Sequence, residues 1–282
     1  MSEYLSVEQL ITLAIREDVR DGDHTSLATI PSNARGEAIL LIKDFGVLAG
    51  IDIARMVFEQ FDNALIFIPL LDDGANVSPG DIAFRVAGSS RSLLTAERLV
   101  LNFMQRMSGI ATHTRQLVNL ISDLPVTLLD TRKTTPNMRV FEKMAVKIGG
   151  GGNHRFGLFD MILVKNNHID FAGGLTSAVK STLDYLQKNN KNLPIEVEVR
   201  NMDELNELLQ TEGVQRVMLD NFSVADMKKA VEMINGRLET EASGGITNET
   251  LRAYAETGVN FISVGALTHQ IRSLDMSLRA IR

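Results

Sequence analysis

The second half of the chain repeats one pattern of secondary structure. From Leu124 onward, short apolar runs alternate with segments whose apolar residues have helical spacing. Alternating strands and helices predict parallel strands joined by right-handed crossovers. The apolar runs cover residues 126–129, 161–164, 195–199, 216–219, 237–240 and 261–264. Six such strands can close into a barrel or lie in an open sheet, and periodicity alone does not distinguish the two.

Reactive residue types follow these runs and favour the barrel. The runs end in Asp-Thr-Arg-Lys, Lys-Asn-Asn-His, Glu-Val-Arg, Asp-Asn, Ser-Gly-Gly and Gly-Ala-Leu. In β/α barrels the active site lies at the carboxyl ends of the strands. We therefore expect these six ends to meet at one catalytic mouth.

The first part of the chain predicts a separate α/β domain. Ser6 and Gln9 have the form of a capping box, so we expect a helix that runs to about Asp18. Strands are predicted over residues 35–44 and 64–71, followed by a long helix over residues 92–121 that Gly109 kinks or breaks. The expected domains are an N-terminal α/β sandwich (1–110), an incomplete six-stranded β/α barrel (111–268) and a C-terminal helix (269–282) that returns to the first domain.

Composition excludes several classes of function. The 282 residues include no cysteine, which excludes disulfides, thiolate metal sites and a cysteine nucleophile. The net charge of −6 is unlike the basic excess of nucleic-acid-binding proteins, so we expect no nucleic-acid partner. No signal peptide is recognisable, and the apolar runs are too short to cross a membrane, so we expect a cytoplasmic protein without a membrane partner.

Basic residues gather between Asp130 and Asp170. Seven basic residues stand there against four acidic ones. If they converge, the ligand is a small and highly charged anion. Arg132 and Lys133 follow a predicted strand, although an isolated Arg-Lys pair is more often an exposed turn. The guanidinium fork of arginine suits carboxylates, whereas lysine suits phosphate as a point charge.

Four consecutive glycines precede a His-Arg pair. Gly149–Gly152 lead to His154 and Arg155. Such a run costs chain entropy, so it indicates a backbone that comes close to something. A flexible linker is the alternative, but the glycines are flanked by regular elements. With Lys165, these cations imply a ligand that carries several carboxylates, or a carboxylate and a phosphate.

Three carboxylates are predicted at neighbouring strand ends. Glu196 and Glu198 alternate along one strand and therefore share a face. Two inward carboxylates need cations or a metal, whereas an edge strand with both glutamates in water is the alternative. Asp220 adds a third carboxylate. Mg²⁺ binds one or two carboxylates together with ligand phosphate oxygens, which fits a pyrophosphate-bearing substrate.

Two glycine-containing loops follow the last two predicted strands. One is Ser243-Gly244-Gly245, after which Asn248 could cap a helix, and the other is Val264-Gly265-Ala266. Barrels often bind phosphate with loops at these positions.

The residues above resemble the quinolinate phosphoribosyltransferase family over nearly the whole chain. The motifs that carry the resemblance cover residues 17–18, 22–23, 46–50, 96–98, 108–112, 130–136, 149–158, 163–169, 196–199, 219–222, 243–246 and 264–269. Each motif is modest alone, and their order and spacing together are specific. His24 and Lys147 depart from the family's usual residues, and neither belongs to the implied catalytic set.

The resemblance implies an enzyme of NAD synthesis. The family transfers phosphoribose from phosphoribosyl pyrophosphate to quinolinate, releases pyrophosphate and CO₂, and requires Mg²⁺. The implied product is nicotinate mononucleotide. The implied fold is the sandwich with an incomplete barrel, and the implied assembly is a homo-oligomer, a dimer or a hexamer, with shared active sites.

The resemblance also implies a role for each matched site residue. Arg98 would be contributed by a neighbouring subunit, Lys133 would lie at the reacting centre, and Glu198 and Asp220 would face the ribose and Mg²⁺. The implied quinolinate-binding residues are Thr131, Arg132, His154, Arg155 and Lys165. The implied residues for the 5′-phosphate are Ser243, Gly244, Gly245, Val264, Gly265, Ala266 and His269.

Three other readings stay open. A paralogue of the same fold could use another acceptor, although Lys165 and His154-Arg155 favour a dicarboxylate. A non-catalytic phosphosugar-binding protein is the second, and the presence of Lys133, Glu198 and Asp220 argues against it. The third is a barrel lyase that uses Lys165 as a Schiff base, which would require a desolvated lysine.

Overall fold

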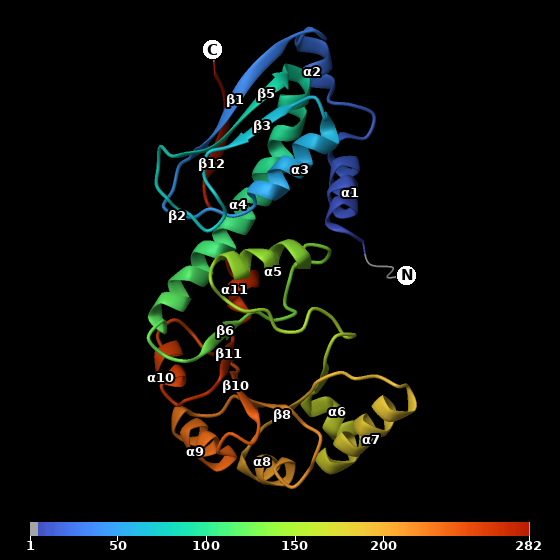
Figure 1. Ribbon diagram of the computed structural model, residues 1–282, viewed down its shortest axis with the longest axis vertical. Coiled ribbons are helices and arrows are strands. Elements are labelled where there is room, and N and C mark those ends of the chain that lie inside the picture. The colour runs from blue at the N-terminus through green and yellow to red at the C-terminus, as the bar shows by residue number, and fades with distance from the viewer. Residues whose placement is uncertain (1–4, 282) are drawn as a thin grey trace. The chain divides into compact units, whose positions relative to one another are not determined.

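The computed structural model describes residues 5–281 and divides into two compact units (Figure 1). The N-terminal unit comprises residues 1–115, 134–150 and 267–282, and the barrel unit comprises residues 116–133 and 151–266. Each unit is therefore assembled from separated segments of the chain. The sequence-based division into folding domains at residues 110 and 268 stays a prediction.

The N-terminal unit is built on an antiparallel sheet with strand order β12-β1-β5-β3. Its strands are β1 (Arg35–Ile42), β3 (Ile66–Pro69), β5 (Ile82–Ser89) and β12 (Met276–Ile281), and a separate small ladder joins β2 (Gly46–Val47) to β4 (Asn76–Val77). The strands predicted over residues 35–44 and 64–71 correspond to β1 and β3.

Amphipathic helices complete the N-terminal unit. They are α1 (Val7–Val19), α2 (His24–Thr29), α3 (Ile51–Phe61), α4 (Ser90–Leu120), whose last residues belong to the barrel unit, and α5 (Arg139–Ile148). The predicted capping box is confirmed, because the Ser6 side chain accepts from the backbone of Gln9 and the Gln9 side chain accepts from the Ser6 backbone. The Phe58 ring of α3 packs against Phe67 and Phe84 of the sheet and forms an aromatic core.

Two local predictions for this unit are wrong. The predicted break at Gly109 is wrong, because helix α4 continues through this residue. A Cβ at Gly109 would collide with the backbone oxygen of Arg272, so the glycine permits a close approach of two segments. A helix was predicted over residues 269–282, but residues 276–281 instead form strand β12, which pairs with β1. It does return to the N-terminal unit, where an unpaired sheet edge offers more hydrogen bonds than an isolated short helix could retain.

The barrel unit contains one parallel six-stranded sheet in the order β6-β11-β10-β9-β8-β7. Its strands are β6 (Thr127–Leu129), β7 (Ile162–Val164), β8 (Ile195–Val199), β9 (Arg216–Asp220), β10 (Glu239–Ser243) and β11 (Phe261–Ser263). Strand β10 begins two residues later than predicted. The parallel register aligns all six carboxyl ends at one edge.

Helices connect these strands and lie in an arc around them (Figure 1). They are α6 (Asn166–Phe171), α7 (Leu175–Lys188), α8 (Met202–Leu208), α9 (Val224–Ile234), α10 (Leu251–Ala255) and α11 (Ala266–His269), the last of which ends in the N-terminal unit. The N-cap of α10 is Thr250, so the expectation that Asn248 caps it is wrong.

The glycine-rich segment occupies the gap between β6 and β7. Gly152 forms a parallel bridge with Leu129 of β6, and its N–H donates to the carbonyl of Leu128 at 2.7 Å. The Arg155 guanidinium donates to the carbonyl of Met161, next to β7, at 3.1 Å. Residues 152–155 thus replace a strand at the open side of the barrel. This regular pairing is inconsistent with the flexible-linker alternative.

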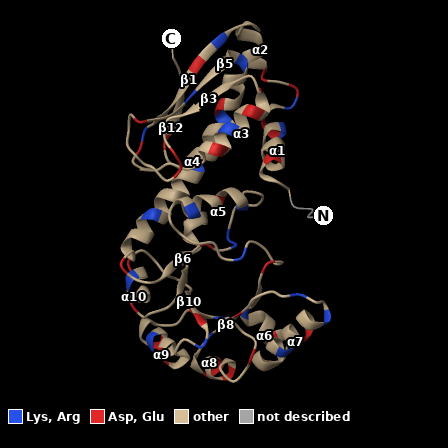
Figure 2. Cartoon of the chain, in the orientation of Figure 1, with Lys and Arg blue, Asp and Glu red and all other residues tan. Residues whose placement is uncertain are grey.

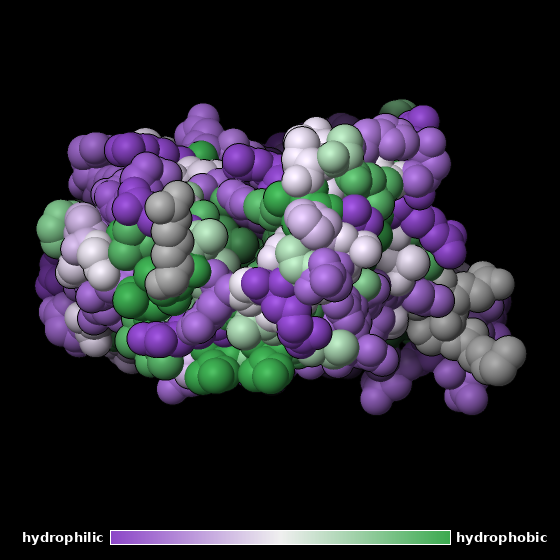
Figure 3. Space-filling view, turned by 90° about the horizontal axis from the view of Figure 1, so that it is seen from above, coloured by the Kyte–Doolittle hydropathy of each residue, from purple (hydrophilic) through white to green (hydrophobic). Residues whose placement is uncertain are grey.

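The surface carries no membrane-spanning signal. Among residues 5–281, no helix combines the length and apolar character that a bilayer crossing requires. Apolar and polar residues are interspersed on the face seen from above (Figure 3). Several large apolar side chains are nevertheless exposed, for example Phe45 at 71% and Ile66 at 59%.

Candidate active site

Glu198, Asp220 and Lys165 lie together at the ends of β7, β8 and β9. Burial raises the pKa of Glu198, and the neighbouring Asp220 carboxylate raises it further, whereas Lys165 lowers it. Glu198 is only 9% exposed, while Lys165 is exposed at the start of α6. Two close carboxylates of which one is buried favour a cation as a partner. The prediction that Glu198 faces inward is confirmed, because β8 has hydrogen-bonded neighbours on both sides.

Arg155 and Arg132 form a close pair of like charges. Burial lowers the pKa of the half-buried Arg155 guanidinium, and the positive charge of Arg132 lowers it further. The Glu196 and Asp160 carboxylates oppose this shift. Two neighbouring guanidinium groups repel each other, and an anionic ligand with planar carboxylates would relieve that repulsion.

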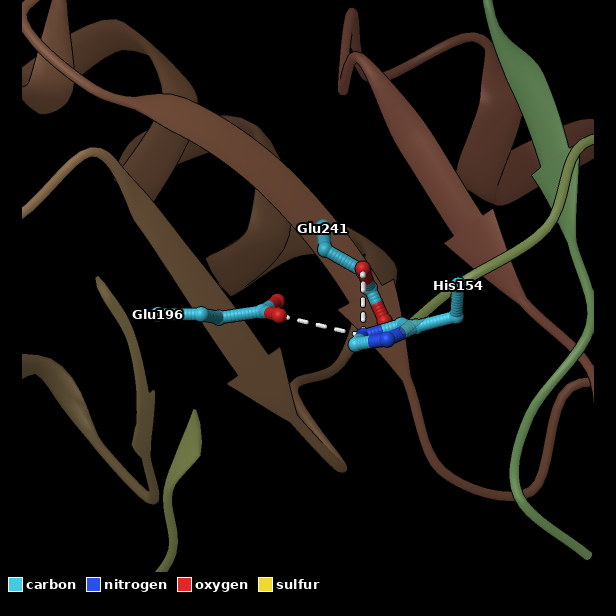
Figure 4. Close-up of side chains that lie close together, drawn as sticks. All are labelled: His154, Glu196 and Glu241. Carbon is cyan, nitrogen blue, oxygen red and sulfur yellow. Dashed lines mark ion pairs between the residues drawn. The ribbon is translucent and has the colours of Figure 1, made fainter. Parts of the chain in front are cut away.

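His154, Glu196 and Glu241 form a cluster inside the barrel unit (Figure 4). The Nε2 atom of His154 lies 3.0 Å from Oε2 of Glu196 and 3.5 Å from Oε2 of Glu241. Both glutamates are completely buried, and His154 is 8% exposed. The three side chains come from β8, β10 and the glycine-rich segment. They are also the group among residues 5–281 whose atoms could jointly hold a metal ion.

Both buried glutamates have raised pKa values. Burial raises the pKa of Glu196 to about 7, although Arg216 and Arg155 oppose the shift. Burial, together with the Glu196 charge, raises the pKa of Glu241 to about 8. Arg216 offsets part of this charge, since its NH1 atom lies 3.5 Å from Oε2 of Glu241. Its guanidinium also stacks 3.8 Å from the centre of the Phe261 ring.

Asp130 fixes the main chain beside this cluster. Its carboxylate is fully buried and accepts from the His154 backbone N–H at 2.8 Å and from the Asn153 side chain at 2.7 Å. The Nδ1 atom of His154 accepts from the Arg155 backbone N–H at 2.7 Å. The residue that directly follows β6 thus orients the His-Arg pair.

The two predicted phosphate loops lie on neighbouring strands. Ser243 ends β10, and its hydroxyl accepts a hydrogen bond from Ser263 of β11 at 3.2 Å. Gly244 and Gly245 both have positive φ angles of 96° and 61°, which glycine adopts without strain. Val264 donates its N–H to the carbonyl of Leu129 at 3.0 Å, and Gly265 and Ala266 follow directly.

The remaining predicted residues are more exposed. The Thr131 hydroxyl accepts from the Lys133 backbone N–H at 3.0 Å, and the Lys133 side chain is exposed at the end of its loop. Arg98 lies exposed on α4, and His269 is exposed at the end of α11. Both belong to the N-terminal unit, whereas all other predicted site residues belong to the barrel unit.

Three residues of this region were not singled out from the sequence. They are the buried Asp130 and Glu241 and the partly buried Arg216. Glu241 and Ser243 share a strand face, so period-two alternation could have identified Glu241 as inward once Ser243 was chosen. Acidic and basic positions occur together around β8, β10 and the adjoining loops (Figure 2).

A hollow of 370 Å³ lies beside the predicted site. It is lined by Arg200, Asn201, Met202, Asp203, Asn221, Phe222, Ser223 and Asp226. These residues follow the ends of β8 and β9 but include none of the predicted site residues. Arg200 is engaged there by Glu204 at 2.5 Å and Asp170 at 3.1 Å.

Family comparisons cover nearly the whole chain. The family model "Quinolinate phosphoribosyl transferase, C-terminal domain" matches residues 110–279, and the corresponding N-terminal domain model matches residues 23–108. A curated relative from Oryza sativa subsp. japonica, "Nicotinate-nucleotide pyrophosphorylase [carboxylating], chloroplastic", is 46% identical over 97% of this chain and 77% of its own length. A Bacillus subtilis relative, "Probable nicotinate-nucleotide pyrophosphorylase [carboxylating]", is 39% identical over 98% of this chain and 93% of its own.

Solved structures agree with this similarity. The structure of NadC from Streptococcus pyogenes has a TM-score of 0.91 and 37% identity, with complete coverage of both chains. The nicotinate-nucleotide pyrophosphorylase from Francisella tularensis has a TM-score of 0.90 and 42% identity over 98% of this chain and 96% of its own. The predicted fold class and family are thereby confirmed, and this protein belongs to the quinolinate phosphoribosyltransferase family of carboxylating nicotinate-nucleotide pyrophosphorylases.

Proposed function

We propose that this protein transfers the phosphoribosyl group of phosphoribosyl pyrophosphate to quinolinate, with loss of pyrophosphate and CO₂, and so makes nicotinate mononucleotide for NAD synthesis. The observation that carries the proposal is the pairing of two charge clusters at one end of the barrel strands. Arg132 and Arg155 form the cationic cluster, and Glu198 and Asp220 form the anionic one.

The cationic cluster suits a dicarboxylate acceptor. Quinolinate carries two adjacent carboxylates, and two guanidinium forks with the Lys165 ammonium supply enough donors for both. Thr131 contributes a hydroxyl beside Arg132, and His154 belongs to the same segment as Arg155. In our account Arg132, Arg155, Lys165 and Thr131 hold the acid so that its ring nitrogen faces the ribose, and His154 supports Arg155.

The anionic cluster suits the donor. Displacement of pyrophosphate at the anomeric carbon develops oxocarbenium-like positive charge, which the Glu198 and Asp220 carboxylates can stabilise electrostatically. Lys133 lies on an exposed loop, from which its ammonium can offset negative charge on the leaving pyrophosphate. Carboxylate loss then follows from the positive charge on the pyridinium nitrogen. The protein contributes mainly by positioning the two substrates.

Glu198 and Asp220 also fit a magnesium ion. Burial raises the pKa of Glu198 and the neighbouring Asp220 carboxylate raises it further, so a divalent cation would relieve an existing repulsion. Mg²⁺ takes one or two carboxylates and completes its shell with water and substrate phosphate oxygens. When bound there, it would neutralise charge on the pyrophosphate of the donor.

The loops after β10 and β11 are proposed to bind the 5′-phosphate. Gly244 and Gly245 have positive φ angles and directly follow Ser243, whose hydroxyl is a further candidate donor. Val264, Gly265 and Ala266 provide the second loop, and His269 a further donor.

The alternative functions are weaker. A lyase with Lys165 as Schiff base would need a desolvated lysine, whereas the Lys165 side chain is exposed. A paralogue with another acceptor would have no need for two close guanidinium groups. A purely binding protein would have no need for the paired carboxylates of Glu198 and Asp220.

A homo-oligomer with shared active sites is part of the proposal. Arg98 is exposed on α4, as a residue contributed to a neighbouring subunit would be. Exposed apolar side chains such as Phe45 and Ile66 give such an assembly an apolar surface to bury. We also propose a cytoplasmic location, which cell fractionation would test, since the Oryza relative is named as chloroplastic.

A steady-state assay tests the proposed function. Purified protein is supplied with phosphoribosyl pyrophosphate, Mg²⁺ and either quinolinate or nicotinate. Nicotinate mononucleotide from quinolinate alone supports the proposal. Turnover of nicotinate instead, or no turnover by a folded protein, would mean that the acceptor is wrong.

A further inference from the structure

The cluster of His154, Glu196 and Glu241 places two carboxylates beside one imidazole in the barrel interior (Figure 4). Both glutamates are 0% exposed, and a buried carboxylate without compensation is strongly unfavourable. The proposed reaction uses neither glutamate directly. Their retention in the core therefore needs an explanation other than contact with substrate.

Both ring nitrogens of His154 have partners within the chain. The Nδ1 atom accepts from the Arg155 N–H at 2.7 Å, so the proton of the neutral ring belongs on Nε2. That nitrogen faces Glu196 at 3.0 Å and Glu241 at 3.5 Å. The imidazole thus connects the barrel interior to the main chain of Arg155.

Arg155 is the next residue along the same path. Its backbone is held by His154, and its guanidinium donates to the Met161 carbonyl at 3.1 Å. It also lies near Arg132, which repels it. Because the two guanidinium groups repel each other, Arg155 keeps its orientation near Arg132 only if its backbone is held in place.

We infer that Glu196 and Glu241 are positioning residues for the acceptor site. They fix the His154 imidazole, and His154 in turn fixes the orientation of Arg155. This inference rests on the proposed function. In it, the two glutamates fix the imidazole, the imidazole fixes the Arg155 backbone, and Arg155 alone of the His-Arg pair meets the carboxylates of the acceptor.

Arg216 compensates part of the negative charge in the cluster of His154, Glu196 and Glu241. Its guanidinium lies 3.5 Å from Glu241 and 2.9 Å from the half-exposed Glu239, and it stacks over Phe261. One fixed cation therefore already lies beside Glu241, and its charge also acts on Glu196. The donor set of the cluster would also accept a divalent metal, but a neighbouring guanidinium disfavours one.

Steady-state kinetics of four variants test the inference. Glu196→Ala and Glu241→Ala should each raise the KM for quinolinate about tenfold or more, while the KM for phosphoribosyl pyrophosphate stays within about twofold. Glu196→Gln keeps an acceptor for Nε2–H and should restore most of the quinolinate KM. Glu232→Ala, which removes an exposed carboxylate on α9, is the control, and it should change neither KM.

Two results would overturn the inference. If both KM values and the melting temperature shift together in Glu196→Ala, the glutamate has only a structural role. If stoichiometric metal is present in the purified protein and absent from Glu241→Ala, the cluster is a metal site instead.

NMR of the histidine and arginine side chains gives a second test that does not depend on turnover. Its first measurement uses the wild-type protein and therefore cannot be confused with a folding defect of a variant. In the wild-type protein, His154 should remain protonated at Nε2 when quinolinate is added, and a hydrogen bond from that Nε2–H to the ligand would overturn the inference. In Glu196→Gln, the Arg155 Nε–H signal should remain sharp. An inactive wild-type protein would refute the proposed function, and the His154 tautomer would then decide the inference alone.

Discussion

Gly152 pairs with Leu129 at the open side of the barrel, where the peptide of a loop takes the place of a strand. A Cβ at Gly152 would lie 2.8 Å from Cδ2 of Leu129 and 3.0 Å from Cγ2 of Thr127. The glycine run therefore serves a close approach within the protein, and it sets the start of the segment that carries Arg155.

Gly152→Ala should disturb the acceptor site through this contact. Overpacking of about 1–3 kcal/mol is expected, together with a displaced His-Arg pair. The measurements are the melting temperature and the two substrate KM values, with the larger change in the KM for quinolinate. An unchanged quinolinate KM would show that the bridge to β6 does not position Arg155.

Arg155→Ala should remove a charge-assisted contact of roughly 1.5–3 kcal/mol. That corresponds to about 10- to 100-fold in kcat/KM for quinolinate. Arg155→Lys should recover little, since an ammonium cannot reproduce the two parallel hydrogen bonds of the guanidinium. Lys147→Ala, on the exposed side of α5, is the control for loss of a positive charge. Equal effects of Arg155→Ala and Lys147→Ala would argue against a specific contact.

Lys133→Ala should lower kcat more than it raises either KM. The reason is that its ammonium is proposed to act on charge that develops as pyrophosphate leaves. Single-turnover measurements with saturating substrates would isolate this step. A variant with normal kcat and a raised KM would make Lys133 a binding residue.

Glu241 should make the protein less stable as pH rises. Its pKa is raised to about 8 in the folded protein, above the ordinary glutamate value of 4.5. The folded chain therefore binds this proton more tightly, so the contribution is present below about pH 4.5 and lost as pH rises through about 8. Its full size is on the order of a few kcal/mol, and the charge coupling to Glu196 shares it between the two carboxyls.

Urea unfolding of Glu241→Gln between about pH 5 and about pH 8 measures this contribution. The variant should show a flatter dependence of the free energy of unfolding on pH than the wild-type protein. Glu232→Gln, at an exposed position on α9, should keep the wild-type slope. The same slope in Glu241→Gln as in the wild type would show that Glu241 is not the titrating group.

The sequence predicted the parts of the site that follow local rules. Glu196 and Glu198 were placed on one inward face because side chains alternate along a strand, and both are buried. The strand ends of the barrel were found because apolar runs stop where charged residues begin. The edge-strand alternative for β8 is wrong, since β8 pairs with β7 and β9.

What was missed depends on contacts between distant segments. Strand β12 exists because β1 offers it an edge, and no local pattern in residues 276–281 specifies that partner. The start of β10 was misplaced because its inward Glu241 interrupts the apolar run that marks a buried strand. The role of Gly109 depends on the approach of Arg272, which is 163 positions further along the chain by subtraction.

Carbon dioxide release tests the central claim most directly. Quinolinate that carries an isotopic label in its 2-carboxylate is supplied with phosphoribosyl pyrophosphate and Mg²⁺, and labelled CO₂ and nicotinate mononucleotide are quantified together. We predict equal molar amounts of the two products. Nucleotide formation that retains the label, or labelled CO₂ without nucleotide, would contradict the proposed function.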